Sequence, residues 1–362
     1  MSIASEITRL DSAKSALAVS IAAKGVTVPS TTKIDGYAAL VDTITTGGGS
    51  SSYTPPADWI DIDTITDGNI NLLVSDGGLA TYAFICSTST GTYHVDWGDG
   101  TSADFASAAT AEHTYTKGQG QACSRGYTTF KVVISPNAGS LTAFAVTSHS
   151  LATQGQCHNI LSCVIAATHL TTLANAFCKA TAPTVKCYAL ERVNLVGTFT
   201  VLTDATSMFQ SCNSLQSVDV SGMVAVTNAS SMFSSCYSLT AIMATNFARD
   251  ATSVSFSDAF TNCEQLTEIN FSAAKMTVLT AKGASGKLNK LATVTMHASS
   301  LLNGTNPTMD LQYNTLSAAQ LDAIYTNLPT VTGKTINVTG CTGQATSTKS
   351  IATAKGWTVT PT

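Results

Sequence analysis

The stretch S-M-F-Q-S-C-N-S-L-Q-S-V-D-V, residues 207–220, returns twice further along the chain. The second copy, S-M-F-S-S-C-Y-S-L-T-A-I, occupies 231–242, and the third, D-A-F-T-N-C-E-Q-L-T-E-I-N-F, occupies 258–271. The L-x-x-[VI] half extends further, with leading leucines spaced by 24 to 29 residues. This period predicts a solenoid with one turn of chain per repeat. The leading leucines are Leu161, Leu190, Leu215, Leu239, Leu266 and Leu291.

The residue types within a repeat explain why repeats stack. L-x-x-V-x-[VF] predicts a short strand whose leucine and alternate apolar residues point inward. The preceding M-F-x-x-C predicts a turn of helix that lays Phe and Cys on the same core. One such unit is too thin to bury its apolar face alone. Stacking places Leu above Leu and Phe above Phe, each worth about 1.5–3 kcal/mol of burial, and lines the strands up as a parallel sheet.

The motif M-F-x-x-C-x-S-L-x-x-[VI] resembles the BspA-like leucine-rich repeats of bacterial surface proteins, some protist proteins and phage tail proteins. A looser copy lies at Asn175–Cys178, followed by an apparent insertion over 181–188. The resemblance covers the repeats that we assign to 137–296, and Leu141–Val146 is a candidate for their first, capping turn. It implies a solenoid that binds other macromolecules, and it implies no reaction.

Residues 57–136 predict a small β-sandwich. The run W-G-D-G-T at 97–101, with H-T-Y at 113–115 and a β-rich segment from Tyr127, resembles an immunoglobulin-like domain of the polycystic-kidney-disease type. The sequence departs from that pattern by an insertion over 116–124, which predicts a longer loop. Asp96 and Asp99 invite a calcium interpretation, but side-chain-to-backbone hydrogen bonds that fix the turn are favoured. We expect His113 to pack beside Trp97 rather than act in catalysis.

The N-terminal residues 1–46 predict an amphipathic helix followed by a second short helix. Two helices this short cannot form a stable domain alone, so we expect them to oligomerise or dock onto a partner. The segment resembles the N-termini of tailed-phage tail and baseplate proteins; the alternative is a plain helical hairpin. A Gly/Ser linker follows over 47–56. The residues expected to mediate attachment are Ile3, Ile7, Leu10, Leu17 and Ile21.

Residues 297–362 predict a closing cap for the solenoid. Ser317 is an N-cap candidate for a helix over 317–325, which Leu328-Pro329 ends. A strand is predicted over 335–338, a short helix over 347–355 and a last strand over 357–360. The predicted fold class is therefore multidomain and mainly β with short helices: an N-terminal helical segment, an immunoglobulin-like sandwich and a leucine-rich-repeat solenoid with a parallel sheet.

Composition limits the classes of function. Only 11% of residues are charged, 18 basic against 22 acidic, which argues against nucleic-acid binding. The 44% of hydrophobic residues can build a core and argue against disorder. There is no apolar run of membrane-spanning length, so we expect no membrane insertion. The N-terminus lacks the pattern of a secretion signal. If the chain begins at its native Met1, an exported-looking protein without a signal fits a virion component.

The cysteines and the usual catalytic motifs give no sign of chemistry. Cys212, Cys236 and Cys263 recur at one repeat position, so we expect a ladder of small buried residues rather than disulfides or a zinc site. A bridge among Cys163, Cys178 and Cys187 stays open. The sequence contains no G-x-S-x-G, P-loop, H-E-x-x-H or G-x-G-x-x-G, and we expect no enzyme activity, cofactor or metal.

These observations predict a phage tail or baseplate-associated fibre protein that docks through its N-terminus and displays repeats for host-surface binding. Its expected partners are other tail proteins and a host-surface glycan or protein. A homotrimer is what the resemblance to tail fibres implies. The alternatives are a bacterial surface adhesin with the same modules, disfavoured because signal and anchor are missing, and a purely structural virion decoration. The predicted binding face comprises Gln216, Ser217, Asp219, Thr240, Thr267, Glu268 and Asn270.

Overall fold

The computed structural model describes Lys14 and residues 53–77, 81–147, 156–157, 159–179, 185–305 and 307–361. The helices predicted over 1–46, with attachment residues Ile3, Ile7, Leu10, Leu17 and Ile21, lie outside the described residues apart from Lys14. So does most of the predicted linker. The compact unit Ser51–Thr362 is mainly β with few short helices.

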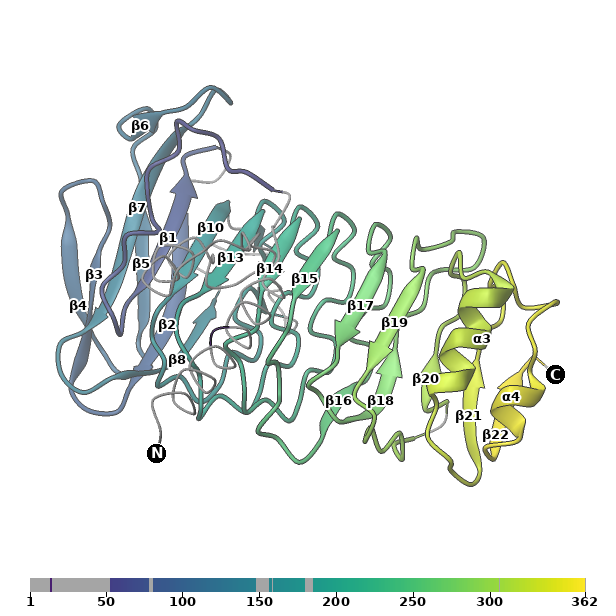
Figure 1. Cartoon of the computed structure of the whole chain (residues 1–362). Helices are drawn as coiled ribbons and strands as arrows, with labels where there is room; N and C mark the ends of the chain where they lie inside the picture. Colours follow the sequence, from purple (N-terminus) through teal and green to yellow (C-terminus); the bar gives the residue numbers. More distant parts are fainter. Residues whose placement is uncertain are drawn as a thin grey trace. The chain divides into compact units, whose positions relative to one another are not determined.

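The front of this unit consists of two sheets packed face to face (Figure 1). Phe84 on one sheet lies 5.5 Å from Trp97 at the end of a strand of the other. Tyr115 stacks on Phe130 at 4.0 Å. Large aromatic side chains therefore fill the space between the sheets. The larger sheet contains β1 (Ile70–Ser75), β3 (Thr92–Asp96), β4 (Ser102–Ala106), β6 (Gln121–Ala122) and β7 (Thr128–Pro136), and the smaller contains β2 (Thr81–Thr88), β5 (Thr110–Thr114) and β8 (Leu141–Val146).

Both sheets continue directly into the repeats. β10 (Ile160–Ile165) pairs antiparallel with β1 on one edge and parallel with β13 (Arg192–Leu195) on the other. The parallel ladder then runs through β14 (Ser217–Asp219) to β15 (Ala241–Met243). On the opposite side β8, the predicted capping turn, pairs with β2, and its Ala143 forms a parallel bridge with Thr172. One hydrophobic core consequently extends from Ile70 to Val359.

The repeats form a parallel β-solenoid of about seven turns. Its first face continues beyond β15 with β17 (Glu268–Phe271) and β19 (Thr293–Met296), which pair with each other. Its second face begins as isolated bridges that link Thr172, Asp204, Asn228 and Ser255. That face then widens into regular strands toward the C-terminus. These strands are β16 (Val254–Phe256), β18 (Met276–Thr280), β20 (Met309–Asp310), β21 (Lys334–Asn337) and β22 (Trp357–Thr360), while β9 (Gln156–Cys157), β11 (Cys178–Lys179) and β12 (Val185–Lys186) form a small separate sheet.

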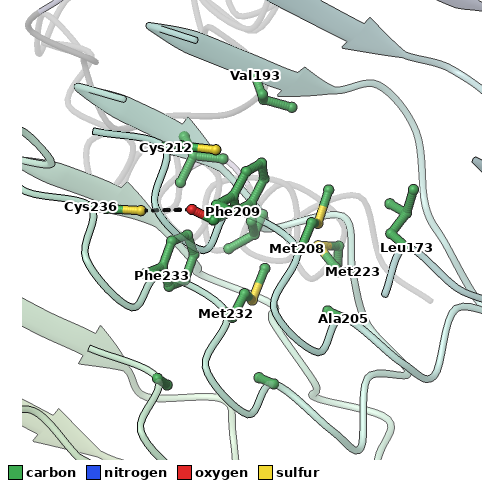
Figure 2. Packing of buried hydrophobic residues seen from close by; sticks show 14 of the residues in the cluster. Leu173, Val193, Ala205, Met208, Phe209, Cys212, Met223, Met232, Phe233 and Cys236 are labelled. Atoms are coloured by element: carbon green, nitrogen blue, oxygen red, sulfur yellow. Dashed lines mark hydrogen bonds between the residues drawn. The ribbon is translucent and has the colours of Figure 1, made fainter. Parts of the chain in front are cut away.

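A ladder of phenyl rings occupies the centre of the solenoid (Figure 2). Phe209 lies 5.6 Å from Phe177 and 5.5 Å from Phe233, with interplanar angles of 8° and 15°. Phe233 stacks in the same way on Phe260 at 5.6 Å. The leading leucines of these turns are also buried. The predicted stacking of Phe above Phe is confirmed.

The M-F-x-x-C segments are turns, so the prediction of a helical turn there is wrong. Ser207 and Ser211 both have positive φ, 53° and 63°, and the equivalent residues of the other copies do as well. Left-handed residues every fourth position interrupt a right-handed helix. Instead, Ser207, Phe209 and Ser211 donate their N–H groups to the next turn of the solenoid, at 2.8–2.9 Å. Each turn is therefore hydrogen-bonded to its neighbour here too.

Two of the recurring cysteines are buried hydrogen-bond donors. The thiol of Cys236 donates to the carbonyl oxygen of Phe209 at 3.1 Å, and Cys263 donates to Phe233 at the same distance. Further along, Asn314 makes the equivalent bond to the preceding turn through its amide, to Ala281 at 2.7 Å. Cys212, Cys236 and Cys263 are free thiols, as predicted from their place in the repeat.

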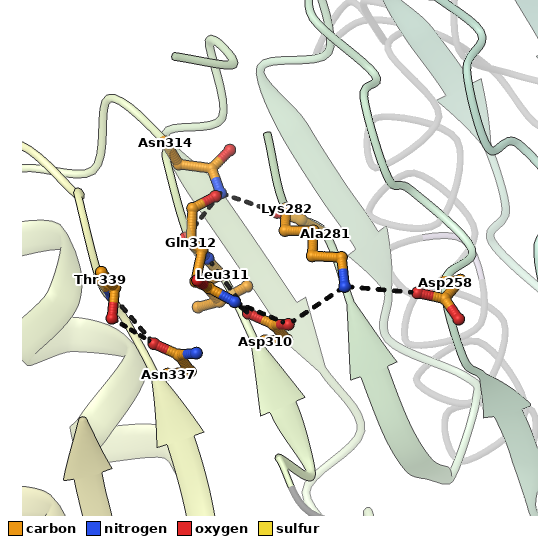
Figure 3. A network of polar contacts seen from close by, with 9 residues as sticks. All are labelled: Asp258, Ala281, Lys282, Asp310, Leu311, Gln312, Asn314, Asn337 and Thr339. Carbon is orange, nitrogen blue, oxygen red and sulfur yellow. Dashed lines mark hydrogen bonds and ion pairs between the residues drawn. The ribbon is translucent and has the colours of Figure 1, made fainter. Parts of the chain in front are cut away.

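Polar side chains stabilise the corner of the second face (Figure 3). Lys282 Nζ lies 3.7 Å from Asp258 Oδ1 and 3.6 Å from Asp310 Oδ2, and thus joins carboxylates of its two neighbouring turns. Asp310 is nearly buried, so it requires this compensation. Asn337 closes the next corner by accepting hydrogen bonds from the backbone and hydroxyl of Thr339 at 3.1 and 2.7 Å.

The C-terminal elements agree with the sequence pattern. α3 (Ala318–Asn327) begins after Ser317, whose side chain forms a capping box with Gln320. It ends at Leu328, ahead of a proline. α4 (Ser350–Thr353) packs on β22 and on α3. At this end the two helices take over from the strands of the first face (Figure 1).

Candidate binding face

The outward positions of the first face form rows that cross the turns. Ser162, Arg192, Ser217 and Ala241 are in register across β10, β13, β14 and β15. Glu268 is in register with a residue of β19 in the later pair of strands. Because neighbouring strands lie about 4.8 Å apart, such a row is a regular array of side chains.

The predicted binding residues do not share one environment. Thr240, Thr267, Glu268 and Asn270 are exposed, and Gln216 is half-buried. Ser217 is only 2% exposed, so it lies under neighbouring side chains instead of at the surface.

Asp219 also differs from the prediction. It is half-buried, and its carboxylate accepts a hydrogen bond from the backbone N–H of Ser221 at 2.9 Å, which closes the turn after β14. The exposed part of the predicted face therefore lies toward β17.

A segment that the sequence did not reveal as part of this face covers its front. Residues 53–66 cross the outer side of β1, β10 and β13. There Trp59 and Ile62 form a second apolar cluster with Leu73 and Val164. Asn71 in β1 donates to the carbonyl oxygen of Ile62 at 2.9 Å. We call residues 53–66 the strap. Its signal is the apolar spacing of Trp59, Ile60, Ile62 and Ile65 just after Pro55-Pro56.

Charged side chains fasten the strap at its two ends. The Tyr53 hydroxyl donates to Glu191 at 2.5 Å, and Arg125 also pairs with Glu191. Burial and the Glu191 hydrogen bond raise the pKa of Tyr53. Further along, Arg192 forms two hydrogen bonds with Asp63, at 3.0 and 2.7 Å. The strap is thus held by a hydrogen bond to Glu191 and an ion pair with Arg192 as well as by its apolar cluster.

The loop inserted at 116–124 lies beside the strap. Ser124 donates its backbone N–H to Asp58 of the strap, and Gln121 donates its side-chain amide to the Asp58 carbonyl oxygen at 2.9 Å. Arg125, the next residue after the insertion, lies over the ring of Trp59, 5.2 Å from the centroid. The longer loop therefore has a structural partner.

Two tyrosines that the predicted face did not include lie at its edge. Tyr188 and Tyr237 are 41% and 38% exposed, and they are the exposed aromatic side chains of the part of the chain that the structure describes. Both stand two positions before the leading leucine of their repeats, Leu190 and Leu239. Comparing the copies position by position would have found them.

The W-G-D-G-T turn forms hydrogen bonds of its own. Asp96 Oδ1 accepts from the N–H of Gly98 at 2.9 Å, and Asp99 Oδ1 accepts from the N–H of Thr101 at 3.0 Å. His113 stacks on Trp97 at 4.8 Å and places Nε2 2.8 Å from Asp99 Oδ2. Both predictions for this site, a fixed turn and a packed histidine, are confirmed.

Within the described residues, no three His, Cys, Asp or Glu side chains gather as a metal site. No helix in the same residues is long and apolar enough to cross a bilayer. Comparisons with family models, curated proteins and solved structures find no match to this chain.

Proposed function

We propose that this chain is a tail or baseplate-associated fibre protein of a phage virion, which docks through residues 1–46 and binds the host surface with its solenoid. The observation that carries the proposal is the exposed first face of the solenoid. Thr240, Thr267, Glu268 and Asn270 present short polar groups there in successive turns. A stacked parallel array has little freedom to rearrange, so it suits repeated weak contacts with an extended surface.

The two parts of the described unit support the same proposal. We assign the front sheets to an immunoglobulin-like domain of the polycystic-kidney-disease type and the turns to BspA-like leucine-rich repeats. The W-G-D-G-T turn with its stacked His113 and the M-F-x-x-C-x-S-L repeats carry these assignments. The parallel solenoid with a phenyl ladder agrees with the second. Both kinds of module are typical of proteins that project from a surface and bind macromolecules.

Residues 1–46 are the proposed attachment segment, and the fibre is proposed to be a homotrimer. Deletion of these residues is expected to abolish incorporation into particles while residues 51–362 stay folded, because the described core is continuous without them. Mass spectrometry of purified particles measures incorporation, and circular dichroism measures folding. A deleted chain that still assembles would disprove the docking role.

Host binding is tested separately. Fluorescently labelled full-length protein is expected to adsorb to cells of susceptible strains and to slow infection by competition. Adsorption that is lost when Thr267, Glu268 and Asn270 are replaced together by Ala supports the exposed face as the binding surface. If the protein is found in wild-type particles but particles that lack it infect equally well, a structural decoration is favoured. Export to the surface of a bacterium would favour an adhesin.

A further inference from the structure

The exposed edge beside the first face carries one row of equivalent residues across three turns. Ser214 donates its N–H to the carbonyl oxygen of Tyr188 at 3.1 Å, and Ser238 donates to the carbonyl oxygen of Asn213 at 3.2 Å. These bonds place Tyr188, Asn213 and Tyr237 at the same position of consecutive turns. We call these three residues the tyrosine row.

The exposure of the two rings is unusual for this protein. Its other large aromatic side chains in the described residues are buried or partly buried, most of them in the central ladder or between the front sheets. The exposed part of a tyrosine ring presents a flat apolar face with a hydroxyl at its edge. Two such rings at one repeat position, and none elsewhere in the described residues, indicate a surface that meets a ligand.

The spacing of the rings fits a linear ligand. Adjacent turns of a parallel stack lie about 4.8 Å apart, so Tyr188 and Tyr237 are separated by about 10 Å along the solenoid axis. An extended chain of pyranose rings advances by about one turn per sugar. Sugars n and n+2 would therefore lie on the two tyrosines, with sugar n+1 above Asn213.

The residue between the rings and those beside them are uncharged and polar. With its amide oriented so that both hydrogen bonds form, Asn213 donates its amide nitrogen to the carbonyl oxygens of Ser211 and Ser235, at 3.2 and 3.0 Å, which fixes the side chain between two turns. The neighbouring Thr240 is exposed and donates to the Gln216 carbonyl oxygen at 3.0 Å. Fixed amides and hydroxyls beside flat rings are the groups that recognise sugar hydroxyls and C–H faces.

We infer that the tyrosine row binds a linear, uncharged oligosaccharide that lies along the solenoid axis, with one sugar ring on Tyr188 and another on Tyr237. This inference rests on the proposed function and names the chemical class of its ligand. The three residues of the row carry no charge at neutral pH, and Glu264, at the equivalent position of the next turn, is paired with Lys287 at 2.6 Å, so an uncharged ligand is favoured. The competing possibility is a protein receptor, and the test must distinguish it from an oligosaccharide.

The test uses the full-length chain and two soluble, uncharged probes, cellohexaose and fully N-acetylated chitohexaose, titrated calorimetrically. Loss of one aromatic contact of about 0.5–1.5 kcal/mol corresponds to about a 3- to 10-fold weaker affinity for Tyr188→Ala or Tyr237→Ala. Tyr237→Phe keeps the ring and is expected to retain binding. Val201→Ala is the matched control, since Val201 is 45% exposed and lies outside the row.

Adsorption to host cells provides the second measurement. If the tyrosine row binds sugar, periodate treatment of the cells and the double alanine variant both reduce adsorption, whereas protease treatment does not. Absence of binding to both hexasaccharides overturns the inference, and so does protease-sensitive, periodate-resistant adsorption. Adsorption that is unchanged in the double alanine variant also overturns it and leaves the proposed function standing. A wild-type protein that adsorbs to no cells removes the proposed function itself.

Discussion

Replacing Phe233 by Ala tests whether the phenyl ladder holds the solenoid together. Phe233 is fully buried, and its ring lies between Phe209 at 5.5 Å and Phe260 at 5.6 Å. Removal of a core phenyl ring costs about 3–5 kcal/mol, and each aromatic pair contributes about 0.5–1.5 kcal/mol beyond burial. Because this ring loses a partner on both sides, we expect a loss in the upper part of that range, about 4–5 kcal/mol.

The three tryptophans allow the two ends of the unit to be followed separately. Trp59 and Trp97 lie in the front, and Trp357 lies in the last strand. In a solenoid each turn contacts only its neighbours, so a defect in a middle turn weakens the coupling between the ends. We expect urea unfolding of Phe233→Ala to split into two transitions. In a Trp357→Phe background the tryptophan fluorescence reports on the front alone. The difference between this signal and that of the protein with Trp357 intact reports on the C-terminal end.

Phe199 provides the control for this experiment. It is as fully buried as Phe233 but belongs to no aromatic pair among the residues that the structure describes. The loss in free energy of unfolding should therefore be about 1–3 kcal/mol smaller for Phe199→Ala than for Phe233→Ala, which is the contribution of two ring pairs. Equal losses for the two variants, or a single transition at an unchanged urea midpoint for Phe233→Ala, would refute the view that the rings couple the turns.

Three further predictions concern the hydrogen bonds and turns. Cys236→Ala removes the donor to the Phe209 carbonyl oxygen and should lower the free energy of unfolding by about 1–3 kcal/mol in chemical denaturation. Cys236→Ser should recover part of this loss. A serine variant that is less stable than the alanine variant would contradict a donor role. Burial opposes ionisation of Asp76, but hydrogen bonds from two backbone N–H groups outweigh it and lower the pKa. The stabilisation by the Asp76 carboxylate is therefore fully present above the unfolded-state pKa near 4, and it is lost as the pH falls through the lower folded-state pKa. Asp76→Asn should lower the free energy of unfolding by about 1.5–3 kcal/mol at pH 7 and make it depend less on pH in the acid range. An unchanged pH dependence in the acid range would argue against this role of Asp76. Gly98 has a φ of +77°, and a Cβ there would lie 2.3 Å from the Lys131 carbonyl oxygen. Gly98→Ala should therefore lower the stability by more than about 1 kcal/mol in thermal unfolding. An unchanged stability would contradict the close contact.

The parts of the fold that sequence reasoning predicts are those in which the copies carry the same residue at the same position. Phe209, Phe233 and Phe260 occupy one position in three copies, so their stacking follows from the period alone. Ser317 and Gln320 are a local signal for a helix start, and the capping box is found there. The M-F-x-x-C spacing has the same i, i+1, i+4 pattern as a helix, and the left-handed conformations of Ser207 and Ser211 distinguish the turn.

The predicted binding face depends on contacts that the local pattern does not contain. Alternation along β14 places Ser217 outward, but its register neighbour Arg192 is occupied with Asp63 of the strap, far away in sequence. The strap itself is held by Glu191 and Arg125, which belong to separate segments. The tyrosine row was readable in principle, because Tyr188 and Tyr237 precede equivalent leucines; the repeat had to be compared position by position.

The way the strap is fastened has a mechanical consequence. A load applied to the chain at residue 53 is shared between the backbone of the strap and the side-chain hydrogen bond of Tyr53 to Glu191, at the junction of the front sheets and the first turns of the solenoid. From there the ion pair with Arg125 passes part of the tension to the inserted loop, and the backbone of β13 passes the rest along the ladder. Tension is thus divided between two paths before any single strand can be peeled away.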